Sequence, residues 1–147
     1  MRLTVTMALV IAGALRPGAG LTAQTIAPPA SVQLSADLLT ELRNGRTALR
    51  RIGWAPAAAE LEEGAGTAFS DAIATLALAI RQAGGSYRAN FYVEPPADKA
   101  TAQRIGAGRF AAVRDALIHA GLPDNLVLPG RVSVDNDARL ELVRTGP

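Results

Sequence analysis

Apolar residues recur along the chain with two different spacings, which divide it into helices and strands. Residues 68–83 are predicted to form a helix, because their apolar positions fall on one stripe before Gly84-Gly85 ends the pattern; the stripe contains Phe69, Ile73, Leu76 and Ile80. A second long helix is predicted over 98–120, where Gly121 follows and Pro123 comes shortly after. Val113 and Leu117 are its predicted core residues. Each helix must bury its apolar side against another element.

Shorter runs in which apolar residues alternate with polar ones predict four strands, over residues 47–54, 87–94, 126–134 and 138–144. The second strand must end at Pro95-Pro96, because proline cannot donate to a ladder of hydrogen bonds. Asp135-Asn136-Asp137 has the composition of a turn, so the last two strands are predicted to form a hairpin. The order β-α-β-α-β-β predicts an α+β fold, a two-layer sandwich with two helices packed on one face of a small mixed sheet.

The N-terminal residues 1–23 have the pattern of a secretory signal peptide. Arg2 is followed by an uncharged, mostly apolar run from Leu3 to Leu15, which is shorter than the ~20 residues of a membrane span. Small residues then offer two cleavage sites, after Gly20 or after Ala23, and we favour Ala23. Residues 24–46 are predicted to be a linker with a short helix, and no transmembrane segment is predicted in the mature chain.

Composition and charge narrow the classes of function. Apolar residues make up 49% of the chain, which is typical of a folded domain, and there is no cysteine and only one histidine. Thiolate metal sites, disulfides and histidine clusters are thereby excluded, and no cofactor is implied. Removing residues 1–23 leaves 13 basic residues, the same number as the acidic ones. A neutral mature chain argues against nucleic acid as a partner.

No catalytic constellation is visible in the sequence. The single histidine, His119, lies near the end of the second predicted helix, where a surface residue is the commoner interpretation. Ser70 with Asp71 and Ser133 with Asp135 have no histidine that spacing can bring to them. We therefore expect a protein that is not an enzyme.

Arg109 is the residue that departs most clearly from the apolar pattern of its helix. At about 100° per residue it lies roughly 40° from Ile105, inside the arc that also contains Val113. A guanidinium there must reach solvent or find a carboxylate, because an unpaired buried charge is costly. Glu94 stands at the end of the preceding strand. Spacing alone leaves two interpretations, a structural salt bridge between Arg109 and Glu94 or a ligand site at the mouth of a cleft.

Three stretches of the sequence carry a resemblance to a known family: Arg109-Phe110-Ala111-Ala112-Val113, the exit Gly121-Leu122-Pro123, and Ala138-Arg139-Leu140-Glu141-Leu142. Residues 91–121 resemble the core of the OmpA-like peptidoglycan-binding domain, found at the C-terminus of OmpA and in MotB and Pal. The final stretch resembles the family's closing strand, N-R-R-V-E-I. The resemblance covers roughly residues 47–147, and the family's fold has the predicted order of elements.

The resemblance implies a binding site for the peptide stem of peptidoglycan. In the family a motif Asp and a motif Arg hold the amine and the free carboxylate of diaminopimelate; the Arg falls on Arg109, and the gapless partner of the Asp is Glu94. Asp98 is the alternative acid if the loop is shorter here. The family's N-x-x-L-S segment reads Ala102–Gly106, so its Asn and Ser are missing, and Pro95-Pro96 replace the residues after the motif Asp.

Two functions from different classes follow. The first is non-covalent peptidoglycan binding in the periplasm of a Gram-negative bacterium, associated with the outer membrane. The second is a degenerate OmpA-like scaffold that contacts envelope proteins without binding peptidoglycan. Whether the Arg109 guanidinium is free in a cleft or already neutralised by Glu94 discriminates between them.

Overall fold

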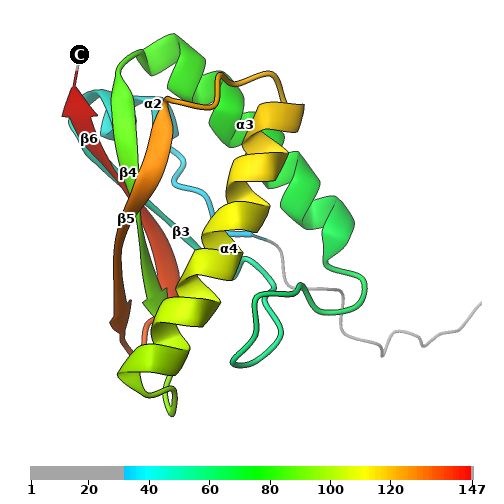
Figure 1. Ribbon diagram of the computed structural model, residues 1–147. Helices are drawn as coiled ribbons and strands as arrows, with labels where there is room; N and C mark the ends of the chain where they lie inside the picture. Colours follow the sequence, from blue (N-terminus) through cyan, green and yellow to red (C-terminus); the bar gives the residue numbers. More distant parts are fainter. Residues whose placement is uncertain (1–31, 147) are drawn as a thin grey trace, which may run out of the picture.

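The computed structural model describes residues 32–146, which form a four-stranded mixed sheet covered by helices on one face (Figure 1). In chain order the elements are α2 (Leu38–Arg43), β3 (Arg46–Arg50), α3 (Gly66–Ala83), β4 (Ser86–Val93), α4 (Lys99–His119), β5 (Val127–Val134) and β6 (Arg139–Gly146). The predicted α+β fold is confirmed. The predicted signal peptide, 1–23, lies outside the described residues.

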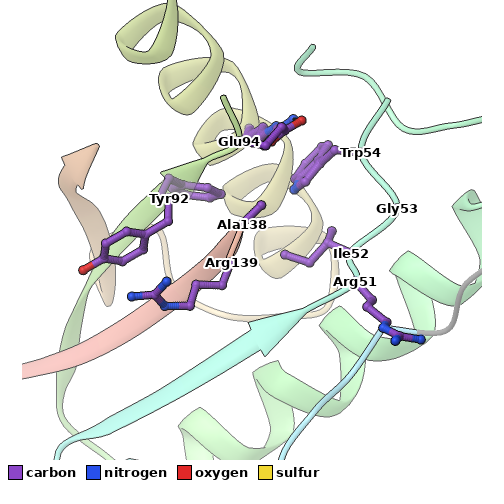
Figure 2. A pocket seen from close by; sticks show the side chains of 10 residues that line it. Arg51, Ile52, Gly53, Trp54, Tyr92, Glu94, Ala138 and Arg139 are labelled. Carbon is purple, nitrogen blue, oxygen red and sulfur yellow. The ribbon is translucent and has the colours of Figure 1, made fainter. Parts of the chain in front are cut away.

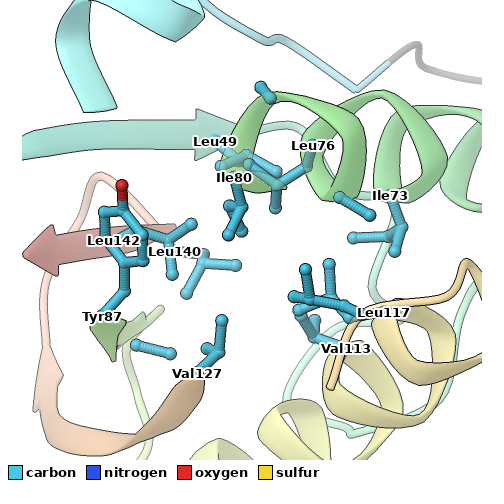
Figure 3. Close-up of a cluster of buried hydrophobic side chains, with 14 of the residues drawn as sticks. Leu49, Ile73, Leu76, Ile80, Tyr87, Val113, Leu117, Val127, Leu140 and Leu142 are labelled. Atoms are coloured by element: carbon cyan, nitrogen blue, oxygen red, sulfur yellow. The ribbon is translucent and has the colours of Figure 1, made fainter. Parts of the chain in front are cut away.

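The two long helices form where the apolar periodicity predicts them. Asp98 is the N-cap of α4, where its side chain accepts a hydrogen bond of 2.7 Å from the Thr101 amide. Figure 3 shows side chains from α3, α4 and the sheet meeting in one apolar cluster. All six predicted core residues are buried: Phe69, Ile73, Leu76, Ile80, Val113 and Leu117. The helix rotations read from the sequence are therefore confirmed.

The strand order β3-β6-β4-β5 shows that the predicted hairpin between residues 126–134 and 138–144 is wrong. Strand β6 pairs antiparallel with both β3 and β4, whereas β5 pairs only with β4, in parallel. Strand β4 lies between β6 and β5, and every second residue from Tyr87 to Val93 is buried. The turn at Asp135 reverses the chain as predicted, but it carries the chain across the end of β4, where the Asp135 amide donates to the Val93 carbonyl over 2.9 Å.

The first strand is shorter than the predicted 47–54. Strand β3 ends at Arg50 because Arg51 and Gly53 have positive φ angles of 55° and 94°, which turn the chain away from the sheet. Trp54 instead makes an isolated bridge with Leu61 in the loop that leads to α3. This departure from the sheet brings Trp54 toward α4.

Residues 32–46 contribute to the same core as the rest of the described chain. Helix α2 packs against α3 and β3, and Leu38 and Leu42 are buried in the main apolar cluster. The short helix expected within 24–46 is present, and the packed unit begins before residue 47.

Two glycines bring α4 close to its neighbours. A Cβ atom built on Gly106 would lie 2.5 Å from a methyl group of Val132 on β5, and one built on Gly108 would lie 2.6 Å from the Ala59 side chain. Helix α4 therefore lies directly against β5 on one side and against the loop after β3 on the other. None of the helices within residues 32–146 is long and apolar enough to cross a membrane.

Candidate functional site

Arg109 forms a bidentate ion pair with Glu94 in the interior of the domain. Nη1 and Nη2 of Arg109 donate to the two carboxylate oxygens of Glu94 over 3.0 and 3.1 Å. Arg109 Nε donates to the carbonyl of Ala58 over 2.8 Å, and Nη2 also donates to the carbonyl of Ala55 over 3.4 Å. The Arg109 side chain is 1% exposed. The guanidinium is therefore surrounded by acceptors of this chain.

Three local features of the sequence place these groups together. The periodicity of α4 turns Arg109 inward, and the end of β4 places Glu94 beside it. The loop after β3 then folds over the pair, with Ala57 at a positive φ of 50° and its amide donating to Glu94 Oε2 over 3.0 Å. The missing side chain at Gly108 leaves room for this loop against α4. The Trp54 ring completes the enclosure, 5.3 Å from the Arg109 guanidinium.

The surroundings of Glu94 keep its carboxylate ionised. Partial burial alone would raise the pKa of Glu94, but hydrogen bonds from Arg109, from its own backbone and from Ala57, together with the charge of Arg109, lower that pKa from 4.5 to about 2. A folded-state pKa below the unfolded one means that the ion pair contributes stability above pH 4.5 and loses it as the pH falls toward 2.

We expect Glu94→Gln to remove part of the acid sensitivity of the domain. The lowered pKa corresponds to about 2–3 kcal/mol of stability at neutral pH. The free energy of unfolding of the wild type should fall by this amount between pH 5 and pH 2. The variant should be less stable than the wild type at pH 7, and its free energy of unfolding should change less between pH 5 and pH 2. Urea unfolding at several pH values measures the difference, with the exposed Glu62→Gln as the matched control. Parallel pH profiles for wild type and Glu94→Gln would contradict the structural pair.

Asp98, the alternative acid, lies elsewhere in the structure. Its side chain caps α4 and is exposed, and the hydrogen bonds from Thr101 lower its pKa. Of the two acids considered from the sequence, Glu94 is the one that meets Arg109. Asp98 is satisfied by the first turn of its own helix.

A cleft of about 290 Å³ borders the ion pair. Its walls come from the loop after β3, the end of β4 and the start of β6, and they include Ile52, Trp54, Phe91, Tyr92 and Ala138. Glu94 reaches the cleft with a side chain that is 28% exposed. In Figure 2 the guanidinium groups of Arg51 and Arg139 point away from Glu94. Arg139 instead stacks over Tyr92, 3.7 Å from the ring centre, and forms ion pairs with Asp135, Asp137 and Glu141.

The sequence did not reveal the groups that cover Arg109. Two backbone carbonyls and the Trp54 ring complete its surroundings, and carbonyls carry no side-chain signature. The sequence does contain one indication of this packing. Gly106 and Gly108 precede Arg109 in the predicted helix, and two glycines so close together leave room for another segment of the chain to pack against that helix. His119 is exposed near the end of α4, with Nδ1 3.0 Å from the Asp115 carbonyl. Within the described residues no group of three or more His, Asp or Glu side chains is placed to hold a metal ion.

Comparisons with known proteins identify the fold. No family model matches the chain, and no curated protein sequence matches it. Among solved structures, the OmpA-like domain of FopA1 from Francisella tularensis subsp. tularensis SCHU S4 is similar with a TM-score of 0.51 and 12% sequence identity, over 83% of this chain and 86% of that one. An outer membrane protein from Borrelia burgdorferi B31 gives a TM-score of 0.52 and 13% identity, over 78% and 96% of the two chains.

Proposed function

The chain has the fold of an OmpA-like domain, and from that premise we propose that it is a non-catalytic domain of the cell envelope whose Arg109–Glu94 pair is structural. In this proposal the domain acts as an assembly scaffold that contacts other envelope components and does not use Arg109 to capture the stem peptide. The observation that carries the proposal is that the Arg109 guanidinium is buried and already neutralised by Glu94.

The hydrogen bonds of Arg109 explain why a free carboxylate has no open place beside it. A guanidinium has five N–H donors, and four hydrogen bonds join this one to Glu94, Ala55 and Ala58. A ligand carboxylate would have to displace Glu94 and also move the loop that covers the pair. Both steps cost free energy, because they leave a carboxylate and two carbonyl groups without their partners.

Export to the periplasm is part of the same proposal. The apolar run of residues 3–15 and the small residues after it support a signal peptide over residues 1–23. The two similar solved structures are described as an OmpA-like domain and an outer membrane protein, which supports an envelope location near the outer membrane.

Weak binding of the peptidoglycan stem is the second candidate, and the cleft beside Glu94 favours it. The Glu94 carboxylate is partly exposed there and stays anionic, so it can accept hydrogen bonds from the ammonium group of diaminopimelate. In this case Arg109 would act as a positioning residue that fixes Glu94. Arg109 would then not be available for the carboxylate of the ligand. The other two arginines that line the cleft, Arg51 and Arg139, point away from Glu94, so that carboxylate would need a cation from elsewhere.

Sedimentation with purified peptidoglycan sacculi of the diaminopimelate type separates the two candidates. We expect protein purified after export to stay in the supernatant at tens of micromolar and low salt. An OmpA-like domain that keeps the family's binding motif serves as the positive control and should pellet with the sacculi. Pelleting of this protein that free diaminopimelate reverses would overturn the scaffold proposal and establish stem binding. Pelleting that only added salt reverses would indicate charge attraction and not recognition of the stem.

A further inference from the structure

The face of the sheet that the helices leave uncovered is rich in arginine. We call this surface the open sheet face; Figure 1 shows that no described element lies over it. Residues on it alternate with the buried ones along β3, β4 and the first half of β6. Its arginines come from all four strands and are Arg46, Arg50, Arg88, Arg131 and Arg139.

The arginines at one end of the open sheet face are neutralised, and those at the other end are not. Arg50 pairs with Asp137 at 3.1 Å, and Arg139 pairs with the acids around it. The ion pairs within residues 32–146 do not include Arg46, Arg88 or Arg131. Arg46 on β3 and Arg88 on β4 are both register partners of Val143 on β6, so the two arginines lie on either side of Val143. A formally neutral domain thus carries a local excess of positive charge on this face.

A bulge between β4 and β5 hollows this basic end. Asn90 lies where the register shifts, and its Oδ1 accepts a hydrogen bond of 2.8 Å from the Arg131 amide. A Cβ atom on Gly130 would collide with Asn90 Oδ1, so glycine keeps this corner open. The resulting hollow measures about 390 Å³ and is lined by Arg88, Asn90 and Arg131 together with Pro129, Gly130 and Val143.

The donors around the hollow fit a phosphate group. The side chains of Arg88 and Arg131 supply planar guanidinium groups, which bind phosphate oxygens through paired hydrogen bonds. One Arg88 nitrogen already donates to the Pro129 carbonyl over 3.2 Å, which holds that side chain at the edge of the hollow. The acid on this face, Glu141, accepts hydrogen bonds from Arg139 and Tyr92, away from the hollow.

We propose that the open sheet face docks on a membrane surface of anionic phospholipids, with a lipid phosphate in the hollow beside Arg88 and Arg131. Charge complementarity favours an anionic lipid surface, and Leu128, 42% exposed beside Arg88, adds an apolar contact. A protein strand added to the free edge of β5 is disfavoured, because Pro129 lacks an N–H donor and the bulge distorts that edge. The proposal rests on the envelope location and goes beyond the scaffold role by naming a surface and its partner.

Co-sedimentation with lipid vesicles tests the proposal. The full exported protein should bind vesicles that contain phosphatidylglycerol at low salt and should not bind vesicles of phosphatidylcholine alone. The triple variant Arg46→Gln, Arg88→Gln and Arg131→Gln should reduce the partition coefficient about a hundredfold, since each arginine near an anionic surface contributes about a factor of five. The control variant Arg81→Gln, Arg104→Gln and Arg114→Gln removes the same charge from the helices and should bind as the wild type does.

Each other outcome overturns the proposal. Equal losses in the two triple variants would mean that only the net charge of the protein matters, and binding to both kinds of vesicle would mean that a net negative lipid surface is not required. Wild-type protein that stays unbound at millimolar phosphatidylglycerol would exclude the membrane, as would binding to soluble polyphosphate without binding to vesicles. The sacculus experiment does not depend on these vesicles, so failure here leaves the structural role of Arg109 standing.

Discussion

Replacing Arg109 by alanine is expected to lower the free energy of unfolding by ~3–5 kcal/mol. The change removes a buried guanidinium and leaves Glu94 without its bidentate partner, and it also deprives the carbonyls of Ala55 and Ala58 of a donor. Urea unfolding monitored by the fluorescence of Trp54 measures the loss, because that ring lies against the guanidinium. A ligand-binding arginine in a wet cleft would give a different result, loss of binding with nearly unchanged stability.

Two further variants separate the ion pair from general damage to α4. Arg114→Ala, on the same helix, removes a half-exposed guanidinium 3.7 Å from Asp124, and we expect it to cost less than ~1 kcal/mol. The double variant Arg109→Leu with Glu94→Leu should be more stable than Arg109→Ala, because no charge is then stranded. If the double variant is the less stable of the two, a stranded Glu94 carboxylate is not the main cost of Arg109→Ala, and that interpretation is wrong.

The sequence was sufficient for the parts of the fold that periodicity determines. The spacing of Phe69, Ile73 and Leu76 sets the buried side of α3, and the same periodicity places Arg109 on the buried side of α4. Arg109 follows Glu94 by fifteen positions, and a strand end followed by a short loop and about three helical turns brings these residues together. These inferences succeed because a helix or a strand fixes which residues share a face.

The sequence did not determine which strands pair with one another or which groups cover Arg109. A turn at Asp135–Asp137 is compatible with a hairpin and with a crossing over the end of another strand. In the structure β4 lies between β5 and β6, and a local turn signal does not contain that long-range pairing. The end of β3 depended on a left-handed backbone at Arg51, which is uncommon for a residue other than glycine. The closure of the site depended on the carbonyls of Ala55 and Ala58, which alanine, with no polar side chain, does not reveal.

Leu117→Ala is expected to destabilise the domain by ~2–5 kcal/mol, by loss of buried apolar surface and by the cavity that remains. Leu117 is 1% exposed and lies in the cluster between α4, α3 and the sheet (Figure 3). Its neighbours there come from separate elements, so they cannot close the gap by rotating one side chain. The midpoint of urea unfolding should fall while the slope of the transition is kept, because the native fold is retained.

The adjacent residue gives the matched control for this prediction. Ile118→Ala removes an aliphatic side chain from the same turn of α4, at a position that is 37% exposed, and it should cost a fraction of the Leu117 effect. Both variants place alanine in a helix, so helix propensity changes little between them and burial is the main difference. Equal shifts in the unfolding midpoint would mean that the rotation of α4 is wrong. The inward position of Arg109 would then be wrong as well, because Leu117 and Arg109 lie on the same buried side of that helix.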